Sequence, residues 1–483
     1  MSAEGRLVVV SNRLPVSVEP GAEGELAVLP GSGGLVTALG PVLRDRGGRW
    51  IGWTGHSGGA SLHAELQRVR SDLGYALEPV DLTAEEIEGF YQGLANEALW
   101  PLFHDLIGHC NFDPAFWPMY VEVNAKFARA IAGASGDADY VWVHDYHLML
   151  VGRALDDLGV RRRLGFFLHI PFPPLDVFEK IPWRQEILEG LLHFELVGFQ
   201  TERDLRNFLQ CLEHRIADCQ ISATDDQATI RVNGREVRAG AIPISIDYAD
   251  FLERAVEDPV SELVARVRMK LPSRHLILGL DRLDYTKGIP HRLEAFDTAL
   301  KRYPELLGRV TLLQIVVPSR TGVGDYAELK DEIDRLVGRV TGDHAAAGWA
   351  PIQYIFRRLT QTELLAYYRA CDVALITPLK DGMNLVCKEY CACSLEDDGV
   401  LILSEFAGAA AELREGALLV NPFDTSQVAD AIHQAITMSA DDRHRRMQHM
   451  RAQVRTHNVY RWVDRFLAMA ARDGSRLGVV AAN

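Results

Sequence analysis

Residues 376–393 read ITPLKDGMNLVCKEYCAC, an apolar run that passes through a polar turn into a helical pattern. An apolar strand followed by a helix is the repeating unit of α/β proteins with parallel sheets. The turn carries Asp381, and the amides that can be exposed after it are those of Gly382, Met383, Asn384 and Leu385. Because a helix N-terminus attracts anions and a carboxylate accepts hydrogen bonds from hydroxyls, this turn predicts a ligand carrying both groups.

Two charged residues, Lys388 and Glu389, follow inside the predicted helix. Glu389 is near enough to the turn to bind a ribose-like diol, so the pattern favours a ligand with hydroxyls and a diphosphate. For the segment taken alone, a second interpretation is a plain helix N-cap by Asp381 with a solvated Lys388–Glu389 pair.

The composition is that of a globular protein, with 48% hydrophobic and 24% charged residues in a chain of 483. A formal net charge of −15 argues against wrapping nucleic acid, but an anionic small molecule needs only a local basic cluster. The seven cysteines include no CxxC pair, which argues against a zinc ribbon or a disulfide framework. No apolar run reaches the roughly 18 residues of a membrane span. We therefore expect a cytoplasmic protein that binds small molecules, not nucleic acid or a membrane, and that can be a homo-oligomer.

Short continuous apolar runs recur along the whole chain, with amphipathic segments such as 325–340 and 361–372 between them. Continuous rather than alternating runs predict strands buried on both faces of a sheet. Residues 241–251 look like a connection that leaves about five strands before it and about six after it, each half the size of a Rossmann-like domain.

The predicted architecture is therefore α/β, with two Rossmann-like domains at 1–243 and 244–456 that face each other across a cleft. The remaining segment, 457–483, contains an amphipathic helix at 459–473 that we expect to pack back on the first domain. In open parallel sheets, ligands bind beyond the carboxyl ends of the strands, so polar residues in those places are the candidates for a site.

A second strand end, GLDRLDYTKGIP at 279–290, carries Arg282 and Lys287. Two cations at a strand end can bind a diphosphate and neutralise a leaving group. A local ion pair of Arg282 with Asp281 or Asp284 is the alternative.

Strand ends in the first half carry further candidates. Arg13 follows the first strand, and Gly33 and Gly34 precede a predicted helix where the backbone could approach a ligand. Arg320 follows a strand of the second half, and with Arg13 it could hold a second anion. Tyr91 and Trp100 are aromatic residues of the kind that flank sugars, although core packing is their commoner role.

A histidine-rich cluster follows two successive strands, with His144, Asp145 and His147 after the first and His169 after the second. A metal site is one interpretation, a sugar-hydroxyl or proton-relay role is another, and buried structural histidines are a third.

Nine motifs in order resemble the trehalose-6-phosphate synthase family: SNRLPV, GGLVTAL, LWPLFH, HDYHLML, FFLHIPFP, GFQTERDLRNF, DRLDYTKGI, TPLKDGMNLVCKEY and SEFAGAAAEL. The match runs from about residue 6 to about residue 465, nearly the whole chain. The resemblance implies the two-domain glycosyltransferase architecture called GT-B. It also implies retaining transfer of glucose from a nucleotide sugar, usually UDP-glucose, to glucose 6-phosphate.

The resemblance also implies roles for individual residues. The donor diphosphate would be held by Arg282, Lys287 and the amides of Asn384, Leu385 and Val386, and the ribose by Glu389. The transferred glucose would be held by Asp381, His169 and the amides of Gly382 and Met383. The acceptor would be held by Arg13, Tyr91, Trp100, Arg320 and Asp145, with Trp53, Gly33 and Gly34 in a loop that closes over the sugars.

The chemistry expected of these residues needs no metal ion or cofactor, because Arg282, Lys287 and the helix amides supply the counter-charge for the leaving diphosphate. No pair of carboxylates is placed for a double displacement, so a same-face mechanism is favoured. The chain departs from the family pattern at 104–117 and 354–361, which bear on the acceptor and the nucleotide base.

Three alternative functions have discriminating features. A transferase for another phosphorylated acceptor, such as glycerol 3-phosphate, or a pseudoglycosyltransferase would share Arg13 and Arg320. A non-catalytic sugar-phosphate sensor should lack the Arg–Lys pair or Asp381, which this chain keeps. A nicotinamide enzyme is disfavoured by the missing GxGxxG.

Overall fold

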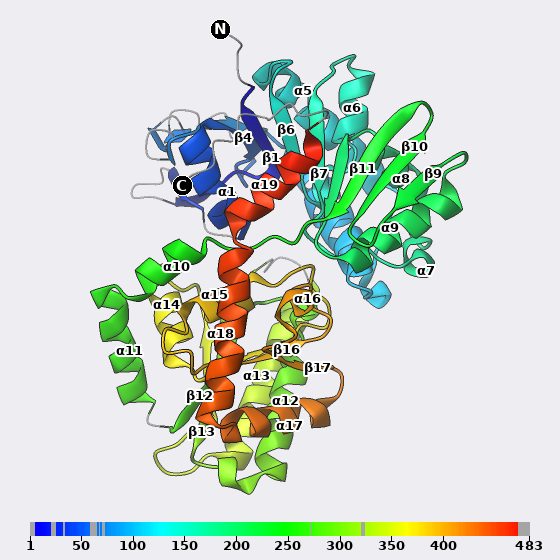
Figure 1. Cartoon of the computed structure of the whole chain (residues 1–483). Coiled ribbons are helices and arrows are strands. Elements are labelled where there is room, and N and C mark those ends of the chain that lie inside the picture. Colours follow the sequence, from blue (N-terminus) through cyan, green and yellow to red (C-terminus); the bar gives the residue numbers. More distant parts are fainter. Residues whose placement is uncertain are drawn as a thin grey trace. The chain divides into compact units, whose positions relative to one another are not determined.

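The computed structural model describes residues 5–20, 26–31, 34–57, 65–66, 68–69, 73–271, 273–319 and 324–471 (Figure 1). The chain divides into two compact units. The first unit combines Met1–Ile244 with Val459–Asn483, and the second is Ser245–Asn458.

The first unit is built on a nine-stranded sheet in the order β5-β4-β1-β6-β7-β8-β11-β10-β9. Its strands are β1 (Leu7–Arg13), β4 (Gly48–Trp53), β5 (Ala76–Pro79), β6 (Tyr140–His144), β7 (Arg163–Phe167), β8 (Leu196–Phe199), β9 (Gln220–Ala223), β10 (Gln227–Val232) and β11 (Arg235–Ala241). A separate antiparallel hairpin pairs β2 (Val16–Pro20) with β3 (Leu26–Pro30). The helices are α1 (Gly34–Arg46), α3 (Ala84–Glu86), the π-helix η3 (Ile87–Leu99), α4 (Trp100–Phe103), η4 (Ile107–His109), α5 (Phe116–Ala134), η5 (Tyr146–Leu148), α6 (Val151–Asp157), α7 (Leu175–Phe178), α8 (Arg184–Leu191), α9 (Glu202–Arg215) and α19 (Val459–Ala470).

The prediction of about five strands in the first half was too low, because it missed β5 at one edge of this sheet and β11, β10 and β9 at the other. At the second of these edges the pairing is also not parallel throughout. Strand β10 pairs antiparallel with both β11 and β9. Buried and exposed residues alternate along β10, as expected for a strand with one face in water. The turn from β10 to β11 uses Asn233 and Gly234, with φ of 50° and 73°, the backbone that an Asn-Gly hairpin turn adopts.

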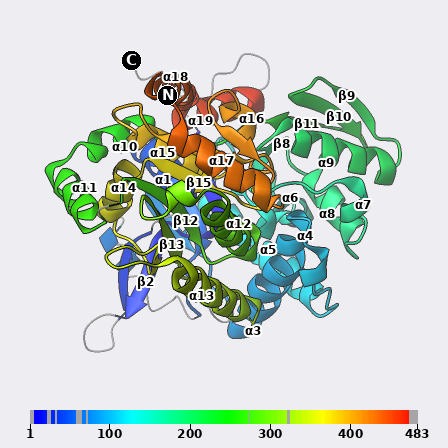
Figure 2. The same cartoon turned by 90° about the horizontal axis from the view of Figure 1, so that it is seen from below.

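The second unit has a six-stranded parallel sheet in the order β14-β13-β12-β15-β16-β17, close to the predicted strand count. Its strands are β12 (His275–Arg282), β13 (Val310–Val317), β14 (Ile352–Phe356), β15 (Val373–Ile376), β16 (Val400–Ser404) and β17 (Leu418–Val420). Its helices are α10 (Tyr248–Ala255), α11 (Asp258–Lys270), η6 (Tyr285–Lys287), α12 (Ile289–Arg302), η7 (Pro304–Leu306), α13 (Gly324–His344), α14 (Gln361–Ala370), α15 (Leu385–Cys393), α16 (Ala410–Leu413), α17 (Thr425–Thr437) and α18 (Ala440–Thr456). Apolar residues of α12, α13 and α17 pack with the strands in one core, and these helices lie together in Figure 2.

Helix α19, drawn in red in Figure 1, belongs to the first unit although it comes from the end of the described chain. The Trp462 ring centroid lies 4.7 Å from that of Trp142 on β6, and the Phe466 ring stacks on Trp142 at 4.1 Å. Arg163 on β7 donates a hydrogen bond to the carbonyl of Ala470 at 3.1 Å. The predicted return of this helix to the first half is therefore confirmed.

Candidate functional site

Three predicted donor residues of the second unit meet beyond the ends of two neighbouring strands, β12 and β15. Lys287 Nζ lies 2.6 Å from Asp381 Oδ2, and their side chains are 11% and 14% exposed. Asn384 Nδ2 donates to the same carboxylate oxygen at 3.1 Å. The structure thus brings a cation, a carboxylate and a side-chain amide into one cluster, from segments 94 residues apart.

The turn that carries Lys287 is fixed locally by its own residues. Asp284 caps it by accepting hydrogen bonds from the backbone amide and hydroxyl of Thr286, at 3.0 and 2.8 Å. Gly288 then adopts φ of 62°, a left-handed backbone that favours glycine and lets α12 begin at once. These constraints hold the ammonium of Lys287 at the strand end.

Residues 406–408 fix the loop of Asp381 through backbone hydrogen bonds. The Asp381 amide donates to the Phe406 carbonyl at 3.3 Å, and the Gly408 amide donates to the Asp381 carbonyl at 3.1 Å. A Cβ at Gly408 would lie 1.9 Å from the Gly382 carbonyl oxygen, so only glycine allows this approach. The sequence indicated Gly408 only as part of a motif, not as a support of the loop.

Helix α15 begins after Asn384, not at Asp381. Asn384 has φ of 77°, and its side-chain oxygen accepts from the Cys387 amide at 3.3 Å. The N-cap interpretation of Asp381 is therefore wrong. Leu385 and Val386 form the first turn of the helix, where amides have no acceptor within the helix. The buried Gly382 and Met383 connect Asp381 to this turn.

The interpretation of Lys388 and Glu389 as a solvated pair is also wrong, because the two side chains are directed to different partners. Lys388 Nζ lies 2.6 Å from Glu412 Oε2, and its side chain is 1% exposed. Tyr368 donates its hydroxyl to Glu389 Oε2 at 2.6 Å. Burial raises the pKa of Glu389, although the tyrosine hydrogen bond opposes that shift.

Arg282 is the exposed last residue of β12, and its neighbour Asp281 is turned inward. Asp281 Oδ2 lies 2.6 Å from Arg292 Nη1, and these side chains are 2% and 0% exposed. Arg292 also donates to the Thr377 hydroxyl at 3.2 Å and to the Lys287 carbonyl at 3.4 Å. Arg292 was not among the residues predicted from the sequence, although its place in an otherwise apolar helical stripe with Ile289 and Phe296 indicated burial.

The predicted acceptor residues of the first unit include an aromatic stack. Trp53 packs edge-on against Tyr91 with ring centroids 5.6 Å apart, and Tyr91 stacks on His147 at 6.0 Å. The Arg13 guanidinium lies 4.8 Å from the centre of the Trp53 ring. A Cβ at Gly55 would come within 2.3 Å of that guanidinium, so this glycine, missed in the sequence, leaves room for Arg13.

The structure corrects the expected placement of Trp53 in a loop. Trp53 is the last residue of β4, is 2% exposed and donates its ring N–H to the His56 carbonyl at 2.9 Å. Gly34 is the first residue of α1, whereas Gly33 and Arg320 lie outside the described residues. Trp100 is 6% exposed, with its ring 4.3 Å from that of His104.

Asp145 and His169 are held together at the ends of β6 and β7. Asp145 adopts φ of 76°, and its Oδ1 accepts a hydrogen bond from the His169 amide at 3.2 Å. His169 Nε2 lies 3.1 Å from Nδ1 of His144. Burial lowers the pKa of His169 to about 3 and that of His144 well below its usual range, so both rings are neutral near pH 7.

The chain matches the sequence signature of glycosyltransferase family 20 over residues 5–472. The chain belongs to glycosyltransferase family 20. This glycosyltransferase is 42% identical over 480 residues to the trehalose-6-phosphate synthase of Mycolicibacterium smegmatis, covering 98% of this chain and 94% of that protein. It is 43% identical over 476 residues to the bifunctional trehalose-6-phosphate synthase/phosphatase of Thermoproteus tenax, covering 96% of this chain but only 63% of that longer protein.

Solved structures similar to this glycosyltransferase include two described with ligands. One is the α,α-trehalose-phosphate synthase (UDP-forming) of Burkholderia xenovorans in complex with glucose 6-phosphate, with a TM-score of 0.86 and 34% identity over 96% of this chain and 100% of that one. The other, from E. coli and bound with UDP-2-fluoro glucose, has a TM-score of 0.86 and 32% identity over 99% of this chain and 100% of that one. These likenesses confirm the predicted GT-B class of two Rossmann-like domains.

The described residues of this glycosyltransferase also bear on metal sites and membrane spans. Across those residues, no group of three or more His, Cys, Asp or Glu side chains is arranged to hold a metal ion. Nor does any helix in the described part of the chain have the length and apolar character to cross a membrane.

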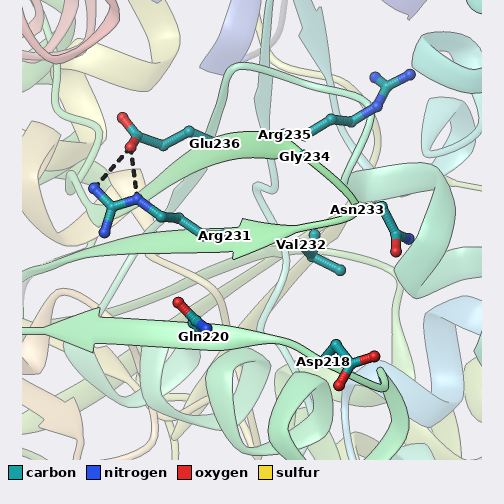
Figure 3. A pocket seen from close by; sticks show the side chains of 8 residues that line it. All are labelled: Asp218, Gln220, Arg231, Val232, Asn233, Gly234, Arg235 and Glu236. Carbon is teal, nitrogen blue, oxygen red and sulfur yellow. Dashed lines mark hydrogen bonds and ion pairs between the residues drawn. The ribbon is translucent and has the colours of Figure 1, made fainter.

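A hollow at the turn between β10 and β11 of this glycosyltransferase has none of the predicted site residues in its lining (Figure 3). It is lined by Asp218, Gln220, Arg231, Val232, Asn233, Gly234, Arg235 and Glu236. Within it, Arg231 pairs with Glu236 at 2.8 Å. We assign it no part in the reaction.

The two neutral histidines predict an acid-sensitive first unit. Their pKa values in the folded protein lie below the unfolded value of about 6.5, so the unfolded state binds more protons as the pH falls. For His169, stability that is fully present above about pH 6.5 should be lost toward about pH 3, by about 1.4 kcal/mol per pH unit. His144 should add a loss in the same direction as the pH falls below about 6.5. Urea unfolding near pH 7.5 and near pH 5.5 should show a smaller loss for His144→Gln than for the wild type. Equal losses of stability in the wild type and in His144→Gln would contradict the lowered pKa assigned to His144.

Proposed function

We propose that this glycosyltransferase moves glucose from UDP-glucose to glucose 6-phosphate with retention of configuration, giving α,α-trehalose 6-phosphate and UDP. The observation that carries the proposal is the cluster of Lys287, Asp381 and Asn384 at the N-terminus of α15. It combines a cation and helix amides for a diphosphate with a carboxylate for sugar hydroxyls. The named relatives, which align over nearly the whole chain, supply the identity of the donor and the acceptor.

On this proposal the second unit binds the donor. Arg282, Lys287 and the amides of Asn384, Leu385 and Val386 stabilise the diphosphate, and Glu389 binds the ribose. Glu389 suits this role because Tyr368 already orients its carboxyl group. Asp381, with the amides of Gly382 and Met383, holds the transferred glucose.

On the same proposal the first unit supplies His169 to the glucose and binds the acceptor. Arg13, together with Arg320 from the second unit, holds the acceptor phosphate, and Asp145, Tyr91 and Trp100 hold its sugar. Trp53 acts through Arg13, because its ring lies under the guanidinium. Its burial in β4 suits a support better than a mobile cover.

The proposed reaction breaks the bond between the glucose anomeric carbon and the diphosphate oxygen. A hydroxyl of the acceptor attacks the same face of the sugar, and its proton passes to an oxygen of the departing phosphate. The positive charge of Lys287 and Arg282 stabilises the negative charge that develops on that phosphate, and no metal ion is needed in this scheme. One neighbouring solved structure was studied for glycosyl transfer with retention.

We propose a cytoplasmic location, because all seven cysteines are free thiols and reduced thiols are typical of that compartment. We propose that its partners are the two sugar substrates rather than nucleic acid, since the net charge is −15. Self-association remains part of the proposal to be measured by light scattering.

A matrix of UDP-, ADP- and GDP-glucose against glucose 6-phosphate, glycerol 3-phosphate and other sugar phosphates tests the function. We expect turnover with UDP-glucose and glucose 6-phosphate, and an α,α-linked product by NMR of the anomeric protons. Exclusive use of glycerol 3-phosphate, a β-configured product, or binding of UDP-glucose without turnover would each overturn the proposal.

A further inference from the structure

A chain of hydrogen bonds runs to His169 from Ile244, where the first of the two segments that form the first unit ends. The Ile244 amide donates to Gln200 Oε1 at 3.0 Å. Gln200 Nε2 lies 3.4 Å from His169 Nδ1, and His169 Nε2 lies 3.1 Å from His144 Nδ1. Gln200 is 2% exposed and His144 is fully buried, whereas His169 between them is partly exposed.

The donor and the acceptor of each hydrogen bond in this series can be assigned one after another. A backbone amide can only donate, so Gln200 must present its oxygen to Ile244 and its NH₂ group to His169. An NH₂ group can only donate, so Nδ1 of His169 is the acceptor and carries no proton. A neutral ring then carries its proton on Nε2 and donates it to Nδ1 of His144.

The surroundings hold the His169 ring in one orientation. Its backbone amide is bound to Asp145, and its ring packs 4.8 Å from Phe167 and 6.1 Å from Trp462. Burial keeps the pKa of His169 at about 3, so the ring is neutral in the working pH range. Nδ1 has a single lone pair, and its contact with Gln200, at 3.4 Å, is at the long end for a hydrogen bond, so a hydroxyl of a ligand can take the place of the Gln200 amide group.

We propose that Gln200 is a positioning residue that fixes His169 as the Nε2–H tautomer in the free protein, so that Nδ1 can accept a hydrogen bond from one hydroxyl of the transferred glucose in place of the Gln200 amide group. Only this catalytic consequence rests on the proposed function, since the tautomer is a property of the protein without ligand. A hydroxyl that lies against Nδ1 must donate a hydrogen bond to it. The enzyme should therefore discriminate against a UDP-sugar that lacks this hydroxyl.

The first test is spectroscopic and uses the full chain without substrate, with ¹⁵N-labelled histidine. The His169 signals are assigned by their loss in His169→Asn. We expect a pyridine-like Nδ1 and a pyrrole-like Nε2 in the wild type. A pyrrole-like Nδ1 on His169 would overturn the proposal, whether or not the protein makes trehalose 6-phosphate.

The second test uses Gln200→Glu to reverse the direction of the hydrogen bond to His169, because a carboxylate can only accept. It should move the His169 proton to Nδ1 and lower kcat/KM for UDP-glucose by about tenfold, the effect of one lost hydrogen bond. The KM for glucose 6-phosphate should stay unchanged. Gln200→Met, which neither donates nor accepts there, is the second variant should Gln200→Glu fail to fold.

The matched control is Gln220→Glu, the same substitution at an exposed position on β9, which should leave the kinetics unchanged. A series of UDP-glucose analogues, each with one hydroxyl replaced by hydrogen, completes the test. The wild type should discriminate against one of them, and Gln200→Glu should lose that discrimination. Wild-type discrimination in both Gln200 variants would contradict a positioning role.

Discussion

Replacing Lys287 with methionine should lower kcat by about 10²–10³-fold, the usual cost of removing one group that stabilises a developing oxyanion. The ammonium lies 2.6 Å from Asp381 beside the first turn of α15, in a place where a diphosphate would need a cation. Methionine keeps the length and the apolar stem of the side chain but removes the charge. Steady-state kinetics with UDP-glucose and glucose 6-phosphate measure the effect.

The matched control is Lys270→Met, an exposed lysine at the end of α11 in the same unit, which should keep the wild-type kcat. The KM for glucose 6-phosphate should be nearly unchanged in Lys287→Met, because Lys287 is assigned to the donor. A kcat within about twofold of the wild type would refute the role of Lys287 in leaving-group stabilisation.

The second large effect is on stability. Arg292→Met should destabilise the second unit by about 3–5 kcal/mol, because it leaves the buried Asp281 without its cation. Burial raises the pKa of Asp281, and the Arg292 guanidinium opposes that shift. Without Arg292 the carboxyl group is either protonated or left as an unpaired charge. Calorimetric or urea unfolding measures the loss.

The double variant Asp281→Asn with Arg292→Met separates the charge from the packing. It should recover part of the stability lost in Arg292→Met, because no unpaired charge then stays buried. If the single and double variants are equally unstable, the pair acts through packing alone. A wild-type stability of Arg292→Met would contradict the inferred burial penalty.

The second unit was largely predictable because its strands are continuous apolar runs, and continuous runs are the pattern of a parallel sheet. The same logic foresaw that Lys287 and Asp381 follow strands, and the adjacency of β12 and β15 explains why they meet. At the edge of the first sheet the prediction failed, because the alternating residues of β10 and the Asn233–Gly234 turn follow a different pattern.

Contacts between side chains were less predictable than strand ends. A buried arginine is rare, so a sequence gives it little weight until the partner Asp281 is seen beside it. Gln200 follows a strand like many polar residues, and only its position between Ile244 and His169 gives its amide a direction. The roles carried over for Arg13, Glu389 and the other site residues stay predictions until a complex is measured.

Because α19 completes the first unit, that unit is discontinuous in the chain, and this constrains the order of events during synthesis. Trp142 and Phe167 gain the cover of Phe466 only when residues 459–470 have left the ribosome. The second unit, Ser245–Asn458, is by then fully translated and free to fold. The half of the protein that emerges first is therefore finished last, with part of its aromatic core open to chaperones in the meantime.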